Sequence, residues 1–369
     1  MKRLFCLIPL FTAGLMQAAQ AVEIDDEVPE SAALATGTNG YRVLRLGTVQ
    51  GGSSFGLALS RNGKAAAGNV WFSIEGNMRP AYFVPGQAPK VIYTDGPGEA
   101  RGVNNLGEAV GWFTQGAQTQ AFRWRLDTGA ITTLPSLGGG SSYAAAINNQ
   151  SEIVGWSESA PGVRHAMLWK GTASTDLGTW GGLSAQATAI NRYGDIVGYR
   201  EVETNGIRYK QGVRKLKGRT PQILRIPTGS DNLVPTGIND NGDITGYMYA
   251  GATGELFSAM AFLRLGDTYK RLRAEPGFPT FARGLNNFRE VAGYKFEGTA
   301  DPRGRGRVWR DNGTTSVSLA ELPEALSRGW YALGDANAIS DTGVIVGTGQ
   351  TVSSSGSRRI EGYMLVPKP

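Results

Sequence analysis

The stretch A-T-A-I-N-R-Y-G-D-I-V-G-Y, residues 187–199, decides the fold of this chain. It reads as a short apolar strand, a turn that contains Asn191 and Gly194, and a second apolar strand. Asn and Gly supply the positive-φ positions that residues with a bulky Cβ avoid, so the pattern predicts a β-hairpin. Related stretches recur along the chain, which makes this hairpin the unit of a repeat.

Seven copies of the hairpin can be aligned on the Asn or Ser that opens each turn. The copies are spaced by 44, 44, 43, 48, 47 and 54 residues. The residue two places before the turn is always small, and an Ile, Leu or Val stands between them. The opening residues are Ser60, Asn104, Asn148, Asn191, Asn239, Asn286 and Ser340, and the small ones are Ala58, Gly102, Ala146, Ala189, Gly237, Gly284 and Ala338.

Two further strands follow the hairpin in most copies. The third is a small residue with aromatic or aliphatic neighbours, as in residues 121–124, and the fourth leads into a Gly-rich link, as in residues 130–140. Four strands per ~44 residues is the size of a propeller blade, in which four-stranded sheets surround a central channel. The pattern therefore predicts an all-β, seven-bladed β-propeller whose first strands are small-residue rich because they converge near the axis.

The first and last strands predict how the ring closes. The chain ends before a seventh fourth strand can form, whereas residues 41–46 have the pattern of a fourth strand but precede the first hairpin. We therefore expect this N-terminal strand to pair with the C-terminal blade, near residues 363–366. Such pairing leaves no open blade edge for aggregation.

The N-terminus predicts export. Lys2 and Arg3, the apolar residues 4–15 and the small-x-small sequence ending at Ala21 form the three regions of a signal peptide. We expect residues 1–21 to be this signal peptide, residues 22–40 to be a disordered acidic leader, and residues 41–369 to be one propeller domain. Glycine, at 53 of 369 residues, is about twice its usual share of ~7% and fits many tight turns.

Composition limits the available chemistry and partners. Cys6 is the only cysteine and lies in the signal, so the mature chain would have neither thiol nor disulfide. The formal charge of +6 includes Lys2 and Arg3 and is too mild to indicate a nucleic-acid partner. No later segment is long and apolar enough to span a bilayer. We expect a secreted monomer, extracellular or periplasmic, with no cofactor and no metal.

The motif resembles the HAF-repeat family of bacterial extracellular proteins. The pattern is A-x-A-I-N-x-x-G-x-I-V-G, then A-F-L-W, then D-L-G-T-L-G-G, and the copies nearest to it are residues 144–156, 166–169, 175–182 and 187–199. The resemblance covers about residues 41–366. It implies a secreted bacterial repeat protein, and it brings no catalytic residues to this chain.

Several repeated polar and aromatic positions have a functional and a structural interpretation. Residues 239–243 resemble part of a calcium loop but match an ordinary turn of the repeat. The acids after the turns could bind cations, although acids beside hairpin turns are usually solvated. The aromatics after the second glycine could stack on sugars, although blade packing is the commoner role. These acids are Glu108, Glu152, Asp195, Asp243 and Glu290, and these aromatics are Trp112, Trp156, Tyr199, Tyr247 and Tyr294.

Variation among the copies predicts where function lies. The links between second and third strands share one face with the links between blades, and they lengthen in the C-terminal half, whereas Lys215, Lys217 and Arg219 should lie on the opposite face. Loop variation on a repeated scaffold favours a non-catalytic protein that binds a polysaccharide, an envelope component or a protein. The expected contacts are Trp180, Arg208, Arg303, Trp330 and Arg358.

An enzyme that acts on glycans, a hydrolase or a lyase, is the alternative. Carboxylates at the channel mouth such as Glu201, Glu255 or Asp301 would then carry the chemistry, but no motif fixes a pair of them. His165, the sole histidine, lacks the G-x-S-x-G motif that would support a Ser-His-Asp triad. The sequence therefore predicts no catalytic residue.

Overall fold

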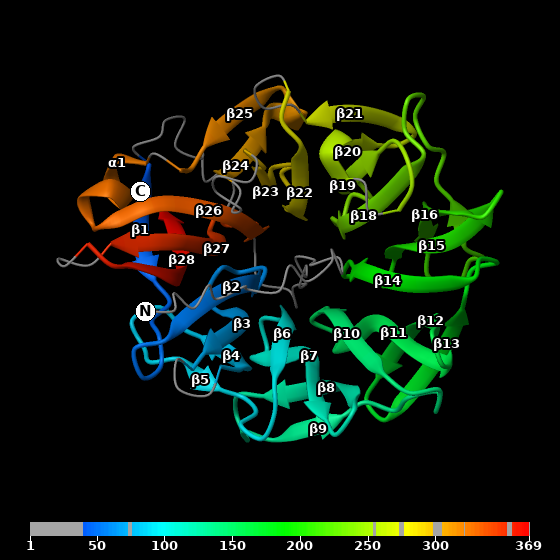
Figure 1. Ribbon diagram of the computed structural model, residues 1–369, viewed down its shortest axis with the longest axis horizontal. Helices are drawn as coiled ribbons and strands as arrows, with labels where there is room; N and C mark the ends of the chain where they lie inside the picture. The colour runs from blue at the N-terminus through cyan, green and yellow to red at the C-terminus, as the bar shows by residue number, and fades with distance from the viewer. Residues whose placement is uncertain are drawn as a thin grey trace, which may run out of the picture.

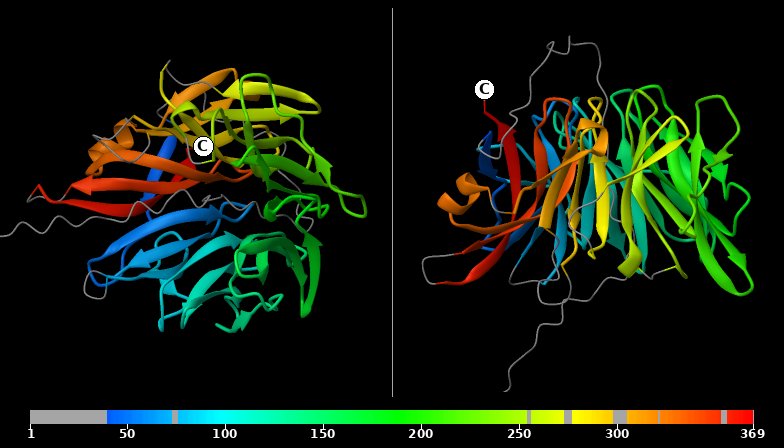
Figure 2. Two further views of the ribbon diagram at one scale, coloured as in Figure 1. Left: turned by 45° about the vertical axis from the view of Figure 1, so that its right-hand side comes forward. Right: turned by 90° about the horizontal axis from the view of Figure 1, so that it is seen from above.

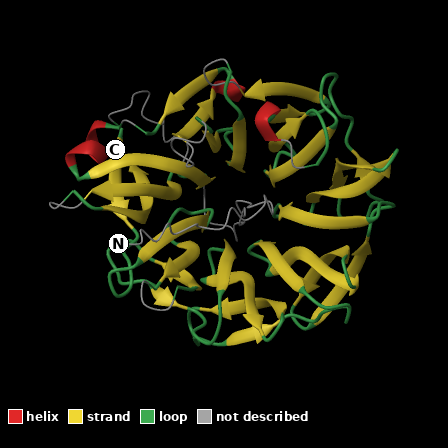
Figure 3. Ribbon diagram, in the orientation of Figure 1, coloured by secondary structure: helices red, strands yellow, loops and turns green. Residues whose placement is uncertain are grey.

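The structure, a computed structural model, describes residues 40–72, 76–253, 256–272, 277–297, 305–320, 322–352 and 356–368. Seven four-stranded sheets are arranged as a ring around a central axis (Figure 1). Strands make up almost all of the regular structure (Figure 3). The predicted seven-bladed β-propeller is thus confirmed. The expected signal peptide, the leader up to residue 39, and Glu255, Asp301 and Arg303 lie outside the described residues.

Each blade is an antiparallel meander, and in blades 1–6 its four strands follow one another in sequence. Blade 1 consists of β2 (Ser53–Leu59), β3 (Ala66–Trp71), β4 (Met78–Phe83) and β5 (Lys90–Val91). Blade 2 consists of β6 (Gly98–Val103), β7 (Glu108–Gln115), β8 (Gln118–Arg125) and β9 (Ile131–Thr133). Blade 3 consists of β10 (Ser142–Ile147), β11 (Glu152–Ala160), β12 (Val163–Lys170) and β13 (Ala173–Gly178). Blade 4 consists of β14 (Ser184–Ile190), β15 (Ile196–Thr204), β16 (Ile207–Lys215) and β17 (Gln222–Ile223).

The C-terminal blades follow the same plan with longer connections. Blade 5 consists of β18 (Asn232–Ile238), β19 (Ile244–Tyr249), β20 (Met260–Leu265) and β21 (Thr268–Leu272), with the 3-10 turn η1 (Leu256–Ser258) between β19 and β20. Blade 6 consists of β22 (Thr280–Leu285), β23 (Val291–Lys295), β24 (Arg305–Arg310) and β25 (Thr315–Ser318), with η2 (Asp311–Gly313) before β25. Blade 7 consists of β26 (Trp330–Ile339), β27 (Ile345–Val352), β28 (Arg358–Pro367) and β1 (Tyr41–Arg45), and the short helix α1 (Pro323–Ser327) precedes it.

The N-terminal strand closes the ring. β1 pairs antiparallel with β28, and the register runs from Tyr41 opposite Pro367 to Arg45 opposite Tyr363. Side chains reinforce the pairing: Arg45 contacts Glu361 at 2.6 Å, and the Tyr41 hydroxyl accepts a hydrogen bond from Arg310 of blade 6. The predicted non-covalent closure is therefore confirmed.

A β-bulge in every first strand explains the repeat motif. The bulged residue stands directly before the small residue, as Ala145 does before Ala146 and Thr188 before Ala189. The bulge turns a first-strand carbonyl toward the second strand, so a Cβ at Gly155 would overlap the carbonyl oxygen of Tyr143. The second glycine is therefore needed opposite the bulge, because only a residue without a Cβ leaves room for that oxygen.

Apolar side chains fill the spaces between adjacent blades. Val110 of blade 2 packs in one cluster with Ile147 and Trp169 of blade 3, and Val197 of blade 4 packs with Ile238 of blade 5. A Cβ at Gly284 would lie 2.9 Å from the Cα of Ala338 in the next blade, so first strands approach closely enough to require small residues. The views in Figure 2 show the blades standing side by side around the axis. The two ends of the ring are therefore the surfaces formed by strand connections.

Candidate functional site

The two ends of the propeller are formed by different strand connections. Because each blade is an antiparallel meander, the connections between first and second strands and between third and fourth strands lie on one end, here called the turn face. The connections between second and third strands and between blades lie on the other, here called the loop face. The β15–β16 and β27–β28 hairpins extend toward the lower edge of the right-hand view in Figure 2, on the loop face.

The asparagine of the repeat motif builds both the turn and a contact to the next blade. Asn148 Oδ1 accepts the backbone N–H groups of Gln150 and Glu152 at 3.1 and 2.9 Å. Its Nδ2 donates to the backbone carbonyl of Asn191 in blade 4 at 3.1 Å. The same interblade bond is made by Asn104, Asn191, Asn239 and Asn286. This repeated amide therefore stabilises the ring and is not left free to bind a ligand.

Four of the five acids that follow the turns are buried, contrary to the expectation from sequence, and the fifth, Asp195, is half-buried. Glu108, Glu152, Asp243 and Glu290 are buried, and each accepts a hydrogen bond from the turn asparagine of its own blade. Each also pairs with a cation. Glu108 pairs with Arg123, and Glu152 pairs with both Lys170 and Lys217. Asp243 pairs with Arg289, and Glu290 pairs with Arg310. Burial is tolerated because these charges are compensated. Lys217 lies on the turn face, as predicted for the opposite side.

The calcium-loop interpretation of residues 239–243 has no support in the geometry. Asp240 points toward the axis, whereas Asp243 contacts Asn239 and Arg289. In the described part of the chain, no group of three or more His, Cys, Asp or Glu side chains is arranged to hold a metal ion. Asn239 Oδ1 instead accepts the N–H groups of Asn241 and Asp243, which is an ordinary Asx turn.

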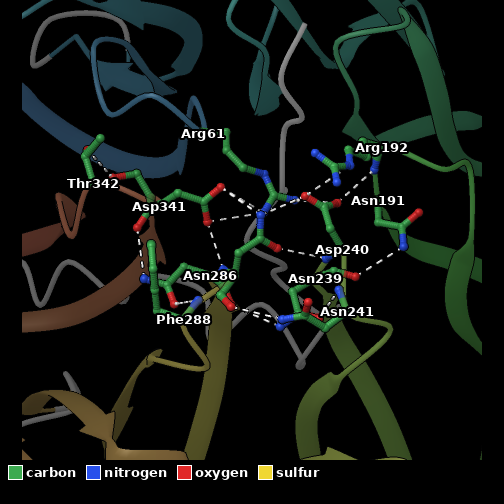
Figure 4. A network of polar contacts seen from close by, with 12 residues as sticks. Arg61, Asn191, Arg192, Asn239, Asp240, Asn241, Asn286, Phe288, Asp341 and Thr342 are labelled. Carbon is green, nitrogen blue, oxygen red and sulfur yellow. Dashed lines mark hydrogen bonds and ion pairs between the residues drawn. The ribbon is translucent and has the colours of Figure 1, made fainter. Parts of the chain in front are cut away.

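Arg61 occupies the axis at the turn face (Figure 4). It lies 3.5 Å from Asp240 of blade 5 and 3.4 Å from Asp341 of blade 7. Asn287 Nδ2 donates to both carboxylates, at 2.7 and 3.0 Å. The Arg61 side chain is only 3% exposed, so this contact between blades 1, 5 and 7 is shielded from solvent.

A second buried polar cluster lies in the wall between blades 1, 2 and 3. The Glu99 carboxylate is held by Arg101, by the indole N–H of Trp112 and by the amide of Asn69. Beside it, burial raises the pKa of Tyr143 to about 12, while Arg101 acts to lower it. The carboxylate has its full set of donors, which is the arrangement of a structural group.

The aromatics after the second glycine pack between or within blades. Tyr247 of blade 5 meets Phe281 of blade 6 edge-on at 5.2 Å, and Tyr199 belongs to the same buried cluster. Trp156 stacks on Tyr143 at 5.8 Å, and Arg164 lies over its ring. These rings therefore pack within and between blades, as the structural interpretation of the sequence predicted.

His165 forms a dyad with Asp176, whose carboxylate oxygens lie 3.0 and 2.9 Å from its Nδ1. Ser157 is paired with His165 across adjacent strands, but its hydroxyl oxygen accepts the N–H of Leu137 and its side chain is buried. The geometry therefore supplies an oriented imidazole without showing a nucleophile beside it.

The predicted ligand contacts divide into two classes. Trp180 and Trp330 are only 8% and 3% exposed. Trp180 donates no indole hydrogen bond and packs in the core cluster of blades 1–4, whereas Trp330 lies against Tyr363 with Arg45 over its ring. Arg208 and Arg358 are exposed at the tips of the loop face, in blades 4 and 7. The structure shows no contact that joins these four residues into one site.

Exposed apolar side chains gather on the loop face of the C-terminal blades, and the sequence analysis missed them. Phe257, in η1, is 87% exposed. The other exposed apolar side chains on this face include Leu183, Ile207, Phe278, Tyr331 and Val352, which stand in connections or strand ends of blades 4–7. Within the described residues, blades 1 and 2 contribute no exposed large apolar side chain to this face.

Comparison with solved structures shows the fold. The β-propeller domain of the Trilobed protease from Pyrococcus furiosus aligns with a TM-score of 0.52 and 8% identity, covering 86% of this chain and 94% of that one. An oligogalacturonate lyase in complex with manganese aligns with a TM-score of 0.51 and 11% identity, covering 95% and 98%. YCF48 bound to a D1 peptide aligns with a TM-score of 0.50 and 12% identity, covering 90% and 96%.

These likenesses extend to the architecture alone, because the identities are low. The Pyrococcus domain is described as having an open velcro topology, whereas β1 and β28 pair in this chain. No protein-family profile and no curated protein matches the sequence. Among the described residues, no helix has the length and apolar character needed to cross a bilayer.

Proposed function

We propose that this chain is an exported, non-catalytic propeller of the HAF-repeat type that binds a protein partner through the loop face of blades 4–7. The observation that carries this proposal is the concentration of exposed large apolar side chains there, led by Phe257. Apolar surface exposed in this way is typical of protein interfaces, because burying it against a partner removes it from water.

Contacts between the loops make this surface continuous. The backbone N–H and hydroxyl of Thr253 donate to the carbonyl of Arg208, at 3.1 and 2.8 Å, which joins the blade 5 loop to the blade 4 hairpin. The N–H of Thr280 donates to the carbonyl of Ala259 at 2.9 Å, which joins blade 5 to blade 6. Lys295 lies 4.8 Å from the ring centre of Phe278. Ile207, Phe257 and Phe278 therefore belong to one connected set of loops.

The side chains of this face favour a protein over a polysaccharide. Sugar rings often bind by stacking on open aromatic faces. The two tryptophans that the sequence offered for stacking are buried, and a cation covers a face of both Phe278 and Tyr331. An envelope protein or another exported protein fits the apolar surface better.

Binding tests this proposal directly. The mature chain, residues 22–369, is immobilised and exposed to the secreted and envelope fractions of its source. Each captured protein is then purified and titrated calorimetrically against wild type, Phe257→Ser and a control, Phe288→Ser, which removes a Phe from the turn face. We expect Phe257→Ser to weaken binding by roughly tenfold or more and the control to bind normally. Equal affinities for the three proteins, or capture of carbohydrate alone, would overturn the proposal.

A further inference from the structure

Blade 7 carries an extended flap on the loop face. β26 is ten residues long, whereas the first strands of the other blades have six or seven. β28 is also ten residues long, and the third strands of the other blades have six to nine. β26 has two bulges beyond the one shared by all blades, and the first lies between Trp330 and Ala332. Tyr331 is the residue bulged there, and it is exposed while both of its neighbours are buried. The bulge therefore presents one aromatic ring to solvent.

Arg358 lies over that ring. Its guanidinium carbon is 3.9 Å from the centre of the Tyr331 ring, and both side chains are exposed. Stacking on an aromatic ring holds a guanidinium in place while the N–H groups at its edge stay available, which lowers the entropy lost when they bind an anion. The pair is thus a preorganised donor at the tip of the flap.

The carboxylates around the flap already have cationic partners. Glu361 pairs with Arg45, and Glu297 of blade 6 pairs with Lys295 and Arg305. In the parts of the chain that the structure describes, Arg358 and the neighbouring exposed Arg359 contact no carboxylate. The flap therefore has an excess of positive charge that the described carboxylates do not neutralise.

We infer that the flap binds an acidic peptide segment of the partner, with a carboxylate held by Arg358. This inference rests on the proposed function, because the flap continues the apolar surface of blades 4–6 around the same face. A guanidinium matches the two oxygens of a carboxylate with two parallel N–H groups. Arg358 covers one face of Tyr331, which leaves less open ring for a sugar to stack on and favours an Asp- or Glu-rich peptide over a uronic-acid polysaccharide.

Fluorescence anisotropy with labelled poly-L-glutamate tests the site in the full mature chain. We expect binding that weakens as salt is added, because exposed charges are screened. Arg358→Ala should weaken it roughly tenfold, and Arg358→Lys by less, since lysine keeps the charge but not the planar fork. The matched control is Arg219→Ala, an exposed arginine of the turn face that should bind normally. Absence of binding, or equal loss in Arg358→Ala and Arg219→Ala, would refute the inference.

Two further arms separate this inference from the proposed function. Polygalacturonate replaces the peptide in one arm, and tighter, Arg358-dependent binding of this polymer would show that the site prefers acidic sugars and overturn the peptide assignment. Phe257→Ser, in the other arm, should bind poly-L-glutamate as wild type does while losing affinity for the captured partner. A partner that needs Phe257 but is indifferent to Arg358→Ala would leave the proposed function standing and reject the acidic segment.

Discussion

Arg61 of blade 1 and Asp240 of blade 5 meet at the axis of the propeller, with Nη2 3.5 Å from Oδ1 and both side chains almost fully buried. The same guanidinium lies 3.4 Å from Asp341 of blade 7. One side chain thus connects the first, fifth and last blades of the ring. The closing strand β1 joins the two ends of the chain at the rim of the propeller, whereas the Arg61 contacts join blades at its centre.

Removing Arg61 should destabilise the whole ring. Arg61→Ala removes the buried cation from Asp341 and leaves Asp240 with the longer contact to Arg192 at 3.9 Å. Breaking a buried pair of this kind costs about 3 kcal/mol of unfolding free energy. Chemical denaturation of wild type and variant measures the difference. Arg125→Ala, which breaks an exposed pair with Asp127, is the control and should unfold as wild type does. Equal stability of Arg61→Ala and wild type would mean that the axial contact is dispensable.

The turn asparagine should tolerate serine better than alanine. Asn148→Ala removes three local hydrogen bonds, one of them to the Glu152 carboxylate, and the bond to Asn191, at a cost of about 2 kcal/mol. Asn148→Ser should cost less, because Ser340 at the same position accepts the N–H of Val344 with its hydroxyl. Thermal melts of the three proteins give the order. A serine variant no more stable than the alanine variant would contradict the equivalence of the two residues at this turn.

Removing β1 should destroy cooperative unfolding. Deletion of residues 22–47 exposes the edge of β28 and removes Val43 and Leu46 from their buried clusters. Deletion of residues 22–39 keeps β1 and serves as the control. Calorimetry should show one sharp transition for the control and a broad or absent one for the longer deletion. Matching transitions would show that the blade stays intact without its fourth strand.

The fold was largely predictable because residues that the blade geometry requires recur at the same positions of each repeat. Turn asparagines, small first-strand residues and second glycines recur at fixed positions, and each meets a steric or hydrogen-bonding requirement of the blade. The bulge was missed, because its residue varies freely: Leu57, Ala145, Thr188 and Arg283 all occupy it. A position that holds Leu, Arg, Ala, Thr and Asn among the seven copies gives no consistent periodic signal, although the glycine opposite it does.

The candidate site was less predictable because it lies where the repeat is interrupted. Trp180 and Trp330 attracted attention as tryptophans in loops, but burial depends on the neighbouring blade, which one copy of the repeat does not reveal. The exposure of Phe257 was not predicted, because one copy of the repeat also does not show which apolar loop residues lack a neighbour to cover them. The only available signal was a Leu-Phe pair inside an otherwise small and polar connection, residues 250–259. The burial of Glu108 and Glu152 also depends on neighbouring blades and strands, whose basic residues are distant in sequence.

Glu152 should make stability depend on pH at the acidic end. Burial acts to raise the pKa of this carboxyl, but hydrogen bonds from Asn148, Lys217 and Lys170 together lower it. A lowered folded-state pKa contributes stability that is complete above the unfolded value of about 4.3 and is lost as the pH falls through the folded value. Glu152→Gln should therefore be less stable than wild type by roughly 1–3 kcal/mol at pH 7, and the gap should narrow below about pH 4. Denaturation at both pH values measures the gap, with Glu203→Gln, at the exposed β15–β16 hairpin, as the control. A gap of constant size across this range would show that the Glu152 charge does not contribute to stability.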